Sequence, residues 1–142
     1  FKIYRPLASK YTKWRTNLTN SDVQGLAELP KEGGNLLIIT KSLKDVMCLH
    51  EMGFYAIAAS SETTFIPENI IKSLRSKWKH IVIIYDRDKT GMLESRKYSK
   101  QYKMDAIFVH KKFKAKDISD AIRDNSYTEI KKWLTKTLER YD

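Results

Sequence analysis

The sequence of 142 residues has little that would cross-link it or hold it in a membrane. Its single cysteine, Cys48, excludes an internal disulfide and a cysteine-based zinc site. No apolar run approaches the roughly 18 residues that a membrane-spanning helix needs, and no secretory signal is visible. The glycines form no dinucleotide-binding fingerprint, because Gly33-Gly34 precedes its predicted strand. We therefore expect no membrane partner and a reducing, cytoplasmic setting. The chain starts at Phe1, so we expect its true start to lie upstream.

Acidic residues are also scarce relative to basic ones. The chain carries 27 lysines and arginines against 17 aspartates and glutamates, a formal charge of +10. With 42% hydrophobic and 31% charged residues, the composition is that of one folded domain. A small domain with this excess of positive charge favours a polyanionic partner, although a lysine-rich surface alone would give the same count.

From residue 35 onward, apolar runs alternate with amphipathic segments. This alternation predicts an α/β fold with about four mostly parallel strands and helices on both faces of the sheet. The expected strands cover residues 36–40, 55–59, 80–85 and 105–109, and the expected helices cover residues 42–52, 67–77, 89–102, 117–123 and 128–138.

Residues 1–34 differ from the rest, and we interpret them as an N-terminal extension that leads into a domain at residues 35–142 with a C-terminal helix. Phe1 to Pro6 suits a short strand that ends at the proline. Ser21 and Asp22 suit the cap of a short helix that continues through Leu26.

Charged residues follow the predicted strands. The run from Ile81 to Tyr85 suits a buried strand, and Asp86-Arg87-Asp88 comes directly after it. Ligands bind at this edge of an open α/β sheet, and two close carboxylates suit Mg²⁺ or Mn²⁺. Each acid also has a purely structural interpretation, since Asp and Glu favour the first turn of a helix. The other strand ends contribute Lys41, Glu62, Lys111, Lys112, Lys116 and Asp117.

The order of these motifs resembles the Toprim domain of primases, topoisomerases and some nucleases. The resemblance rests on a first strand followed by a helix start with Asp45, and on Asp86-Arg87-Asp88 with Gly91 just beyond. The segment Lys116-Asp117-Ile118-Ser119-Asp120 is similar to a stretch of phage primase-helicases. Tyr4-Arg5-Pro6 and Lys13-Trp14 are similar to the lead-in of phage-type primases.

The resemblance implies a site and an activity. Asp86, Asp88 and Asp117 would bind Mg²⁺ or Mn²⁺, with Asp45 catalytic or nearby. Phosphates of nucleic acid or nucleoside triphosphate would lie against a set of basic residues. That set is Lys41, Arg87, Lys89, Lys111, Lys112 and Lys116. The implied reaction is nucleotidyl transfer that builds an RNA primer on single-stranded DNA, in a bacterium or a phage-infected host. A helicase domain or subunit is a further partner that the resemblance implies.

One departure from the family limits this expectation. The family places a glutamate, the expected general acid/base, directly after the first strand, where this chain has Lys41 and Ser42. Glu62 after the second strand is one candidate substitute, and a residue of another domain or of a second copy is another. Alternatively, the domain binds nucleic acid without catalysis. A Toprim-type nuclease is the third possible function.

Overall fold

The computed structural model describes residues 1–61 and 63–142. Within these residues the strands are β1 (Lys2–Tyr4), β2 (Trp14–Thr16), β3 (Val23–Gln24), β4 (Gly34–Thr40), β5 (Tyr55–Ala59), β6 (Trp78–Ile84) and β7 (Asp105–Ile107). The α-helices are α1 (Leu43–Glu51), α2 (Glu68–Lys77), α3 (Lys89–Tyr102), α4 (Ile118–Asp124) and α5 (Tyr127–Leu138). Short 3₁₀ turns cover Leu26–Glu28, Lys111–Phe113 and Glu139–Tyr141.

The main sheet has the strand order β3-β5-β4-β6-β7, and all its neighbours are parallel except the β3–β5 pair. The predicted α/β fold and the mostly parallel sheet are therefore confirmed, with β3 as a short fifth strand at one edge. The chain moves from β4 to β5 on one side and from β6 to β7 on the other. The sheet consequently has its topological switch point between β4 and β6, which is where ligands bind in such folds.

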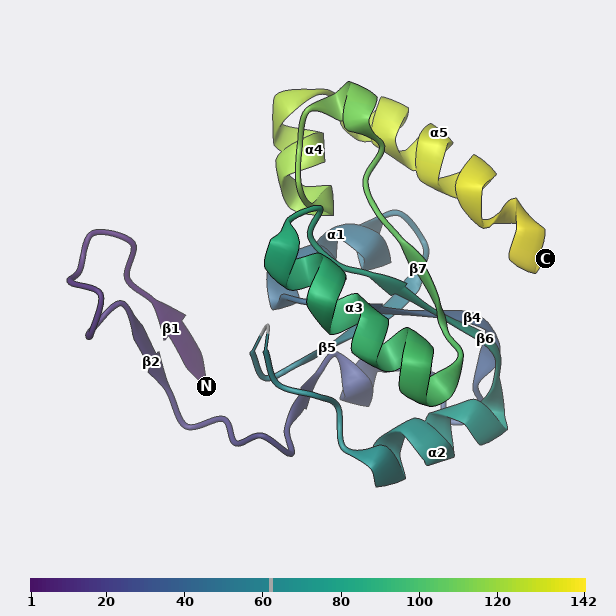
Figure 1. The fold of residues 1–142 in the computed structure, drawn as a ribbon, viewed down its shortest axis with the longest axis horizontal. Coiled ribbons are helices and arrows are strands. Elements are labelled where there is room, and N and C mark those ends of the chain that lie inside the picture. Colours follow the sequence, from purple (N-terminus) through teal and green to yellow (C-terminus); the bar gives the residue numbers. More distant parts are fainter. Residues whose placement is uncertain (62) are drawn as a thin grey trace.

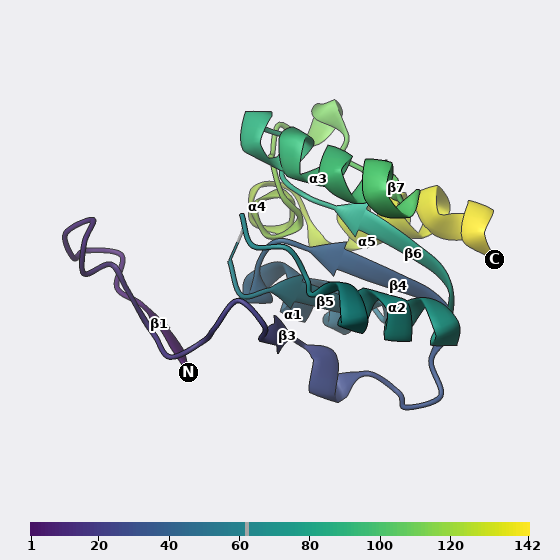
Figure 2. The ribbon, with the colours of Figure 1, turned by 60° about the horizontal axis from the view of Figure 1, so that its bottom comes forward.

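Each face of the sheet packs against its own helices (Figures 1 and 2). Successive residues of a strand point to opposite faces, so Ile38 faces a core with α1, α4 and α5, while Leu37 and Ile39 face a core with α2 and α3. The central strands are apolar on both faces because both are covered. The sequence signal for these strands was strong for the same reason.

The N-terminal segment differs most from expectation. Strands β1 and β2 form an antiparallel hairpin that projects from the sheet, drawn in purple in Figure 1. The predicted helix from Ser21 to Leu26 is wrong, because Val23 and Gln24 instead pair with the open edge of β5. Asp22 does not cap a helix there, since its carboxylate accepts a hydrogen bond from the Thr19 amide at 2.6 Å. The boundary after residue 34 stays a proposal.

The described helices all fall short of what crossing a lipid bilayer demands in length and apolar content. The longest, α3, carries charged residues along its exposed side.

Candidate acidic site at the sheet switch point

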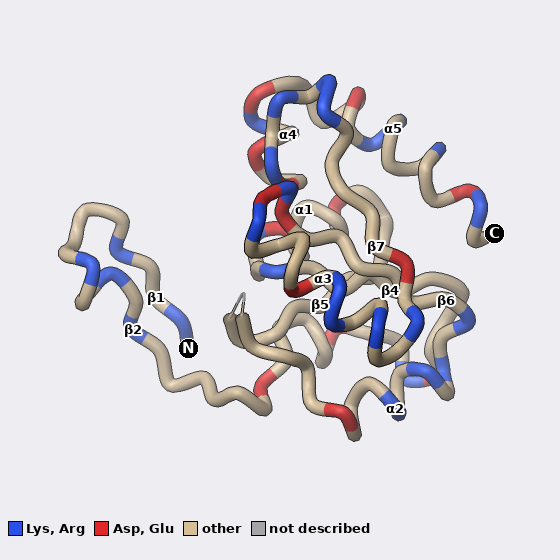
Figure 3. The backbone as a smooth tube through the Cα atoms, viewed as in Figure 1, with Lys and Arg blue, Asp and Glu red and all other residues tan. Residues whose placement is uncertain are grey.

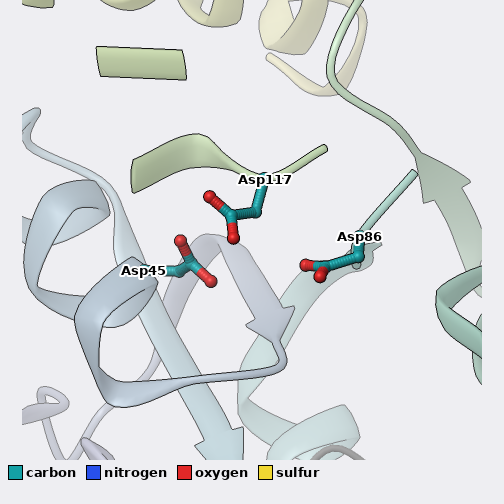
Figure 4. A group of neighbouring side chains, drawn as sticks. All are labelled: Asp45, Asp86 and Asp117. Atoms are coloured by element: carbon teal, nitrogen blue, oxygen red, sulfur yellow. The ribbon is translucent and has the colours of Figure 1, made fainter. Parts of the chain in front are cut away.

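Three buried aspartates meet at the carboxyl end of the sheet. Asp45 lies in the first turn of α1, Asp86 follows β6, and Asp117 precedes α4. One carboxylate oxygen from each lies within 4.8 Å of the others, and Figure 4 shows the three carboxylates pointing toward one another. We refer to Asp45, Asp86 and Asp117 as the acidic cluster.

Local structure fixes two members of the cluster. The Asp45 carboxylate accepts hydrogen bonds from the Ser42 hydroxyl at 2.8 Å and from the Ser119 amide at 3.1 Å. The Asp117 carboxylate caps α4 by accepting from the Asp120 amide at 2.7 Å, and it also accepts from the Ser119 hydroxyl at 3.0 Å. Asp117 therefore has the capping role that its sequence position allowed. The cap of α1 is instead Ser42, and the Asp45 carboxylate bonds the hydroxyl of that cap and an amide at the start of α4.

Asp86 is held differently. Its side chain is fully buried, and its Oδ1 atom has no hydrogen-bond partner among the described residues. Burial raises the pKa of Asp86 to about 6, with Asp117 adding to the rise and Lys41 opposing it. Burial and the nearby Asp117 also raise the pKa of Asp45. A buried carboxylate oxygen without a partner is costly, so its retention here indicates a site for a ligand.

Two lysines partly neutralise the cluster. Lys41 Nζ lies 2.5 Å from Asp86 Oδ2 and 3.9 Å from Asp117 Oδ2. Lys116 Nζ lies 3.5 Å from Asp86 Oδ2 and 4.0 Å from Asp88 Oδ2. Figure 3 shows basic and acidic residues intermixed around the starts of α3 and α4. The charges at this edge of the sheet are therefore closely balanced.

The cluster fits a hard divalent cation. Its free and partly free atoms are carboxylate oxygens, which Mg²⁺ and Mn²⁺ prefer. Asp86 Oδ1 accepts no hydrogen bond within the described part of the chain, and Asp117 Oδ2 lies 3.9 Å from Lys41 Nζ, beyond hydrogen-bond distance. The buried acidic cluster is consistent with catalysis.

The other predicted site residues lie around the cluster. Asp88 stands outside it and caps α3 by accepting from the Gly91 amide at 2.8 Å. Arg87 donates from Nε to the Val109 carbonyl at 2.6 Å, so it ties the end of β6 to the segment after β7. The role of Asp88 as a metal ligand and that of Arg87 as a phosphate ligand stay predictions.

The remaining basic residues are exposed. Lys89 begins α3, while Lys111 and Lys112 lie in the turn after β7, with Lys112 Nζ 4.8 Å from the centre of the Phe113 ring. Glu62, the candidate substitute for the missing glutamate, lies outside the described residues.

A groove of about 570 Å³ runs from the acidic cluster to the β1–β2 hairpin. Lys2 anchors the hairpin by donating to the Ser60 carbonyl at 2.8 Å, beyond the end of β5. The rings of Tyr4 and Trp14 lie 4.5 Å apart, and Lys2 Nζ lies 4.8 Å from the centre of the Trp14 ring. The lining thus joins aromatic faces to basic groups, including Lys41, Lys44 and Lys116. The sequence identified Lys41 and Lys116 but gave no sign that the hairpin would face them.

Ser119 is a further residue that sequence reasoning passed over. It lies inside the Lys116–Asp120 segment and bonds two members of the cluster through its amide and its hydroxyl. Its position two residues after a predicted N-cap was the available signal, since such residues direct their amides toward the helix start.

Comparisons with known proteins agree with this geometry. A family model described as Toprim-like matches residues 38–122, more than half of the chain. A search of curated protein sequences finds no match.

Two solved structures are similar in fold. One contains the bacteriophage T7 lagging-strand DNA polymerase with primase domains of two gp4 subunits bound to an RNA/DNA hybrid and dTTP; the matched chain has a TM-score of 0.56 and 14% identity. The other is the primase fragment of the bacteriophage T7 primase-helicase protein, with a TM-score of 0.55 and 11% identity. Each match covers 83% of this chain, but only 63% and 50% of the respective T7 chains.

Proposed function

Because the chain belongs to the Toprim-like family, we propose that it is the Toprim domain of a primase-like replication protein. Its activity would be Mg²⁺-dependent nucleotidyl transfer that builds an RNA primer on single-stranded DNA. The observation that carries this proposal is the buried acidic cluster at the switch point, where Asp86 Oδ1 has no hydrogen-bond partner among residues 1–61 and 63–142. One of the two similar T7 structures holds an RNA/DNA hybrid and dTTP, which supports the choice of substrate class.

The acidic cluster would hold the metal. Asp86 and Asp117 offer the oxygens that local hydrogen bonds leave open, and Asp45 lies beside them. A bound Mg²⁺ or Mn²⁺ would stabilise the charge that develops on the phosphoryl group during transfer. Ser42 and Ser119 hold Asp45 in place, so the cluster is preorganised by neutral donors. Asp88 remains a proposed ligand at the margin of the site.

Basic and aromatic groups of the groove would hold the substrates. The ammonium groups of Lys41, Lys44 and Lys116 line the wall beside the cluster, where a phosphate chain would neutralise them. Tyr4 and Trp14 offer faces on which bases of a single strand stack. We further propose that the exposed Lys89, Lys111 and Lys112, together with Arg87, extend the phosphate-binding surface.

The family's general acid/base is a glutamate, and Lys41 occupies its position in this chain. We propose Asp45 and Glu62 for this role. The raised pKa of Asp45 supports this role. Burial raises it, which brings proton exchange at this carboxyl group closer to neutral pH.

A second function is favoured by one specific observation. The ion pair between Lys41 and Asp86 places a cation where catalysis in this family uses an acid. A domain so altered would bind single-stranded nucleic acid without turnover. Its affinity would then fall steeply with salt, and Mg²⁺ would produce no product.

Primer synthesis tests the proposed function. The protein is incubated with Mg²⁺, ribonucleoside triphosphates and single-stranded DNA, and labelled products are resolved by length. Asp86→Asn should lower the rate on the order of 100-fold or more, because it removes charge from the proposed metal site. The matched control, Asp124→Asn, alters an exposed acid paired with Arg123 and should leave the rate unchanged. Absence of primers from the wild-type protein would favour the binding module, and cleavage of a plasmid would favour a nuclease.

A further inference from the structure

Lys41 is the most enclosed cation at the acidic cluster. Its side chain is 16% exposed, whereas that of Lys116 is 53% exposed. Its ammonium contacts Asp86 at 2.5 Å and approaches Asp117 at 3.9 Å. A single positive charge therefore already lies between two of the three acids that a divalent cation would use.

The sheet register builds this contact. Thr40, the last residue of β4, pairs with Ile84 of β6, so the two strands end at the same level. Lys41 and Asp86 leave the sheet side by side across the switch point. The register of two central strands thus keeps the Lys41 backbone beside Asp86, whichever way the lysine side chain turns.

The contact leaves part of the site unsatisfied. Lys41 neutralises Asp86 Oδ2, while Asp86 Oδ1 keeps no partner among the described residues. The same lysine lines the groove in which Lys44 and Lys116 lie. Rotation about its side-chain bonds would carry the ammonium from the cluster into that groove without any movement of the backbone.

We propose that Lys41 is a tethered cation that occupies the acidic cluster until a phosphate chain in the groove draws it away. Like charges repel, so a divalent ion binds weakly while the ammonium lies on Asp86. A phosphate group offers the Lys41 ammonium another partner, so the ammonium leaves Asp86. The metal then binds at the position that the ammonium has left, together with the phosphate chain. The proposal deepens the proposed function, on which it rests for the identity of that chain as nucleic acid or nucleoside triphosphate.

Calorimetric titration with Mg²⁺ alone tests the first half. Lys41→Met removes the charge and keeps a long, unbranched side chain, and it should tighten Mg²⁺ binding roughly tenfold or more. The control is Lys72→Met, which removes an exposed cation paired with Glu68 on α2 and should leave the Mg²⁺ affinity unchanged. Unchanged or weaker Mg²⁺ binding by folded Lys41→Met overturns the proposal.

Coupling between metal and phosphate tests the second half. Binding of a labelled oligothymidylate, and separately of a fluorescent nucleoside triphosphate, is measured with and without Mg²⁺. Linkage is reciprocal, so Mg²⁺ should raise the affinity of the wild type for whichever ligand withdraws Lys41. This increase in affinity should be larger in the wild type than in Lys41→Met. Chelation by the triphosphate is the same for both proteins and cancels in the comparison. Equal coupling in both proteins, for both ligands, overturns the proposal.

Two further outcomes are also decisive. If Lys41→Met and Lys41→Gln both fail to fold, the ammonium is needed to neutralise the cluster, and added Mg²⁺ should restore folding. Failure of Mg²⁺ to do so overturns the proposal. These measurements require no turnover, so a domain that makes no primer can still satisfy them, and an active primase can still fail them.

Discussion

Gly91 gives the sharpest test of how the site is built. A Cβ atom at this position would lie 2.1 Å from the Asp86 carbonyl oxygen and 2.9 Å from the carbonyl carbon. The start of α3 thus packs directly on the backbone of a cluster residue, an approach that only glycine permits. We expect Gly91→Ala to force these two segments apart and to displace the Asp86 carboxylate.

The expected magnitude follows from two opposing effects. Alanine gains about 1 kcal/mol over glycine in a helix, whereas overpacking costs about 1–3 kcal/mol and often more when the obstacle is backbone. Because the added Cβ overlaps the Asp86 carbonyl so deeply, the overpacking cost lies at or above the upper limit of that range. The net loss of unfolding free energy is then about 2 kcal/mol. Such a loss corresponds to a melting temperature lower by about 6 °C in a chain of this size.

Thermal unfolding and Mg²⁺ titration are the assays for Gly91→Ala. The control is Gly53→Ala, a position with a φ of +90° and no neighbouring atom within 4 Å of an added Cβ. The control should lose about 1 kcal/mol from the strained backbone alone, with metal binding unchanged. Gly91→Ala should lose stability and metal affinity together. If Gly91→Ala is as stable as the wild type, the close packing of α3 on Asp86 is refuted.

Three further predictions concern other parts of the molecule. Burial raises the pKa of Asp86 from 3.8 to about 6, so ionisation of this one carboxyl should cost the folded state on the order of 3 kcal/mol as pH rises from about 4 through 6. Urea titrations of the wild type and of Asp86→Asn across this range should differ by that fall, because the amide does not titrate. Trp14→Ala should weaken oligothymidylate binding by about 1–3 kcal/mol in fluorescence anisotropy, and an unchanged affinity would exclude the hairpin from the binding surface. Ser126→Ala removes the side chain that accepts from the Glu129 amide at 3.1 Å, so it should cost about 1 kcal/mol of thermal stability without any change in metal or oligonucleotide binding.

The main sheet was predictable because its signals are local. Buried parallel strands appear as apolar runs such as Leu36–Ile39, and helices begin at recognisable caps such as Ser42. Strand β5 and helix α3 have the predicted bounds, while several other ends differ by one or two residues. Such small shifts reflect fraying and long-range pairing that a short window of sequence does not encode.

The N-terminal segment was not predictable in the same way. Val23 and Gln24 have no strong strand pattern, and they become a strand only because β5 offers an unpaired edge. The position of the β1–β2 hairpin depends on Lys2 reaching Ser60, which is 58 residues away in sequence. Contacts between such distant segments leave no periodicity to detect.

The acidic cluster was predictable in part. Strand ends of a parallel sheet converge, which brings Asp86 and Asp117 together as the strand order implied. The contributions of Asp45 and Asp88 depend on side-chain direction: Asp45 turns inward and is buried, while Asp88 turns to cap its own helix. The pairing of Lys41 with Asp86 needed the register of β4 and β6, which sequence alone does not supply.

The most direct test of a metal site at the acidic cluster is a crystal of the protein with bound oligothymidylate, soaked in Mn²⁺ and read by anomalous scattering. We expect an anomalous peak bounded by the carboxylates of Asp45, Asp86 and Asp117, with Lys41 turned toward a phosphate. A map with Lys41 still on Asp86, and with no Mn²⁺ peak at the cluster, would contradict it.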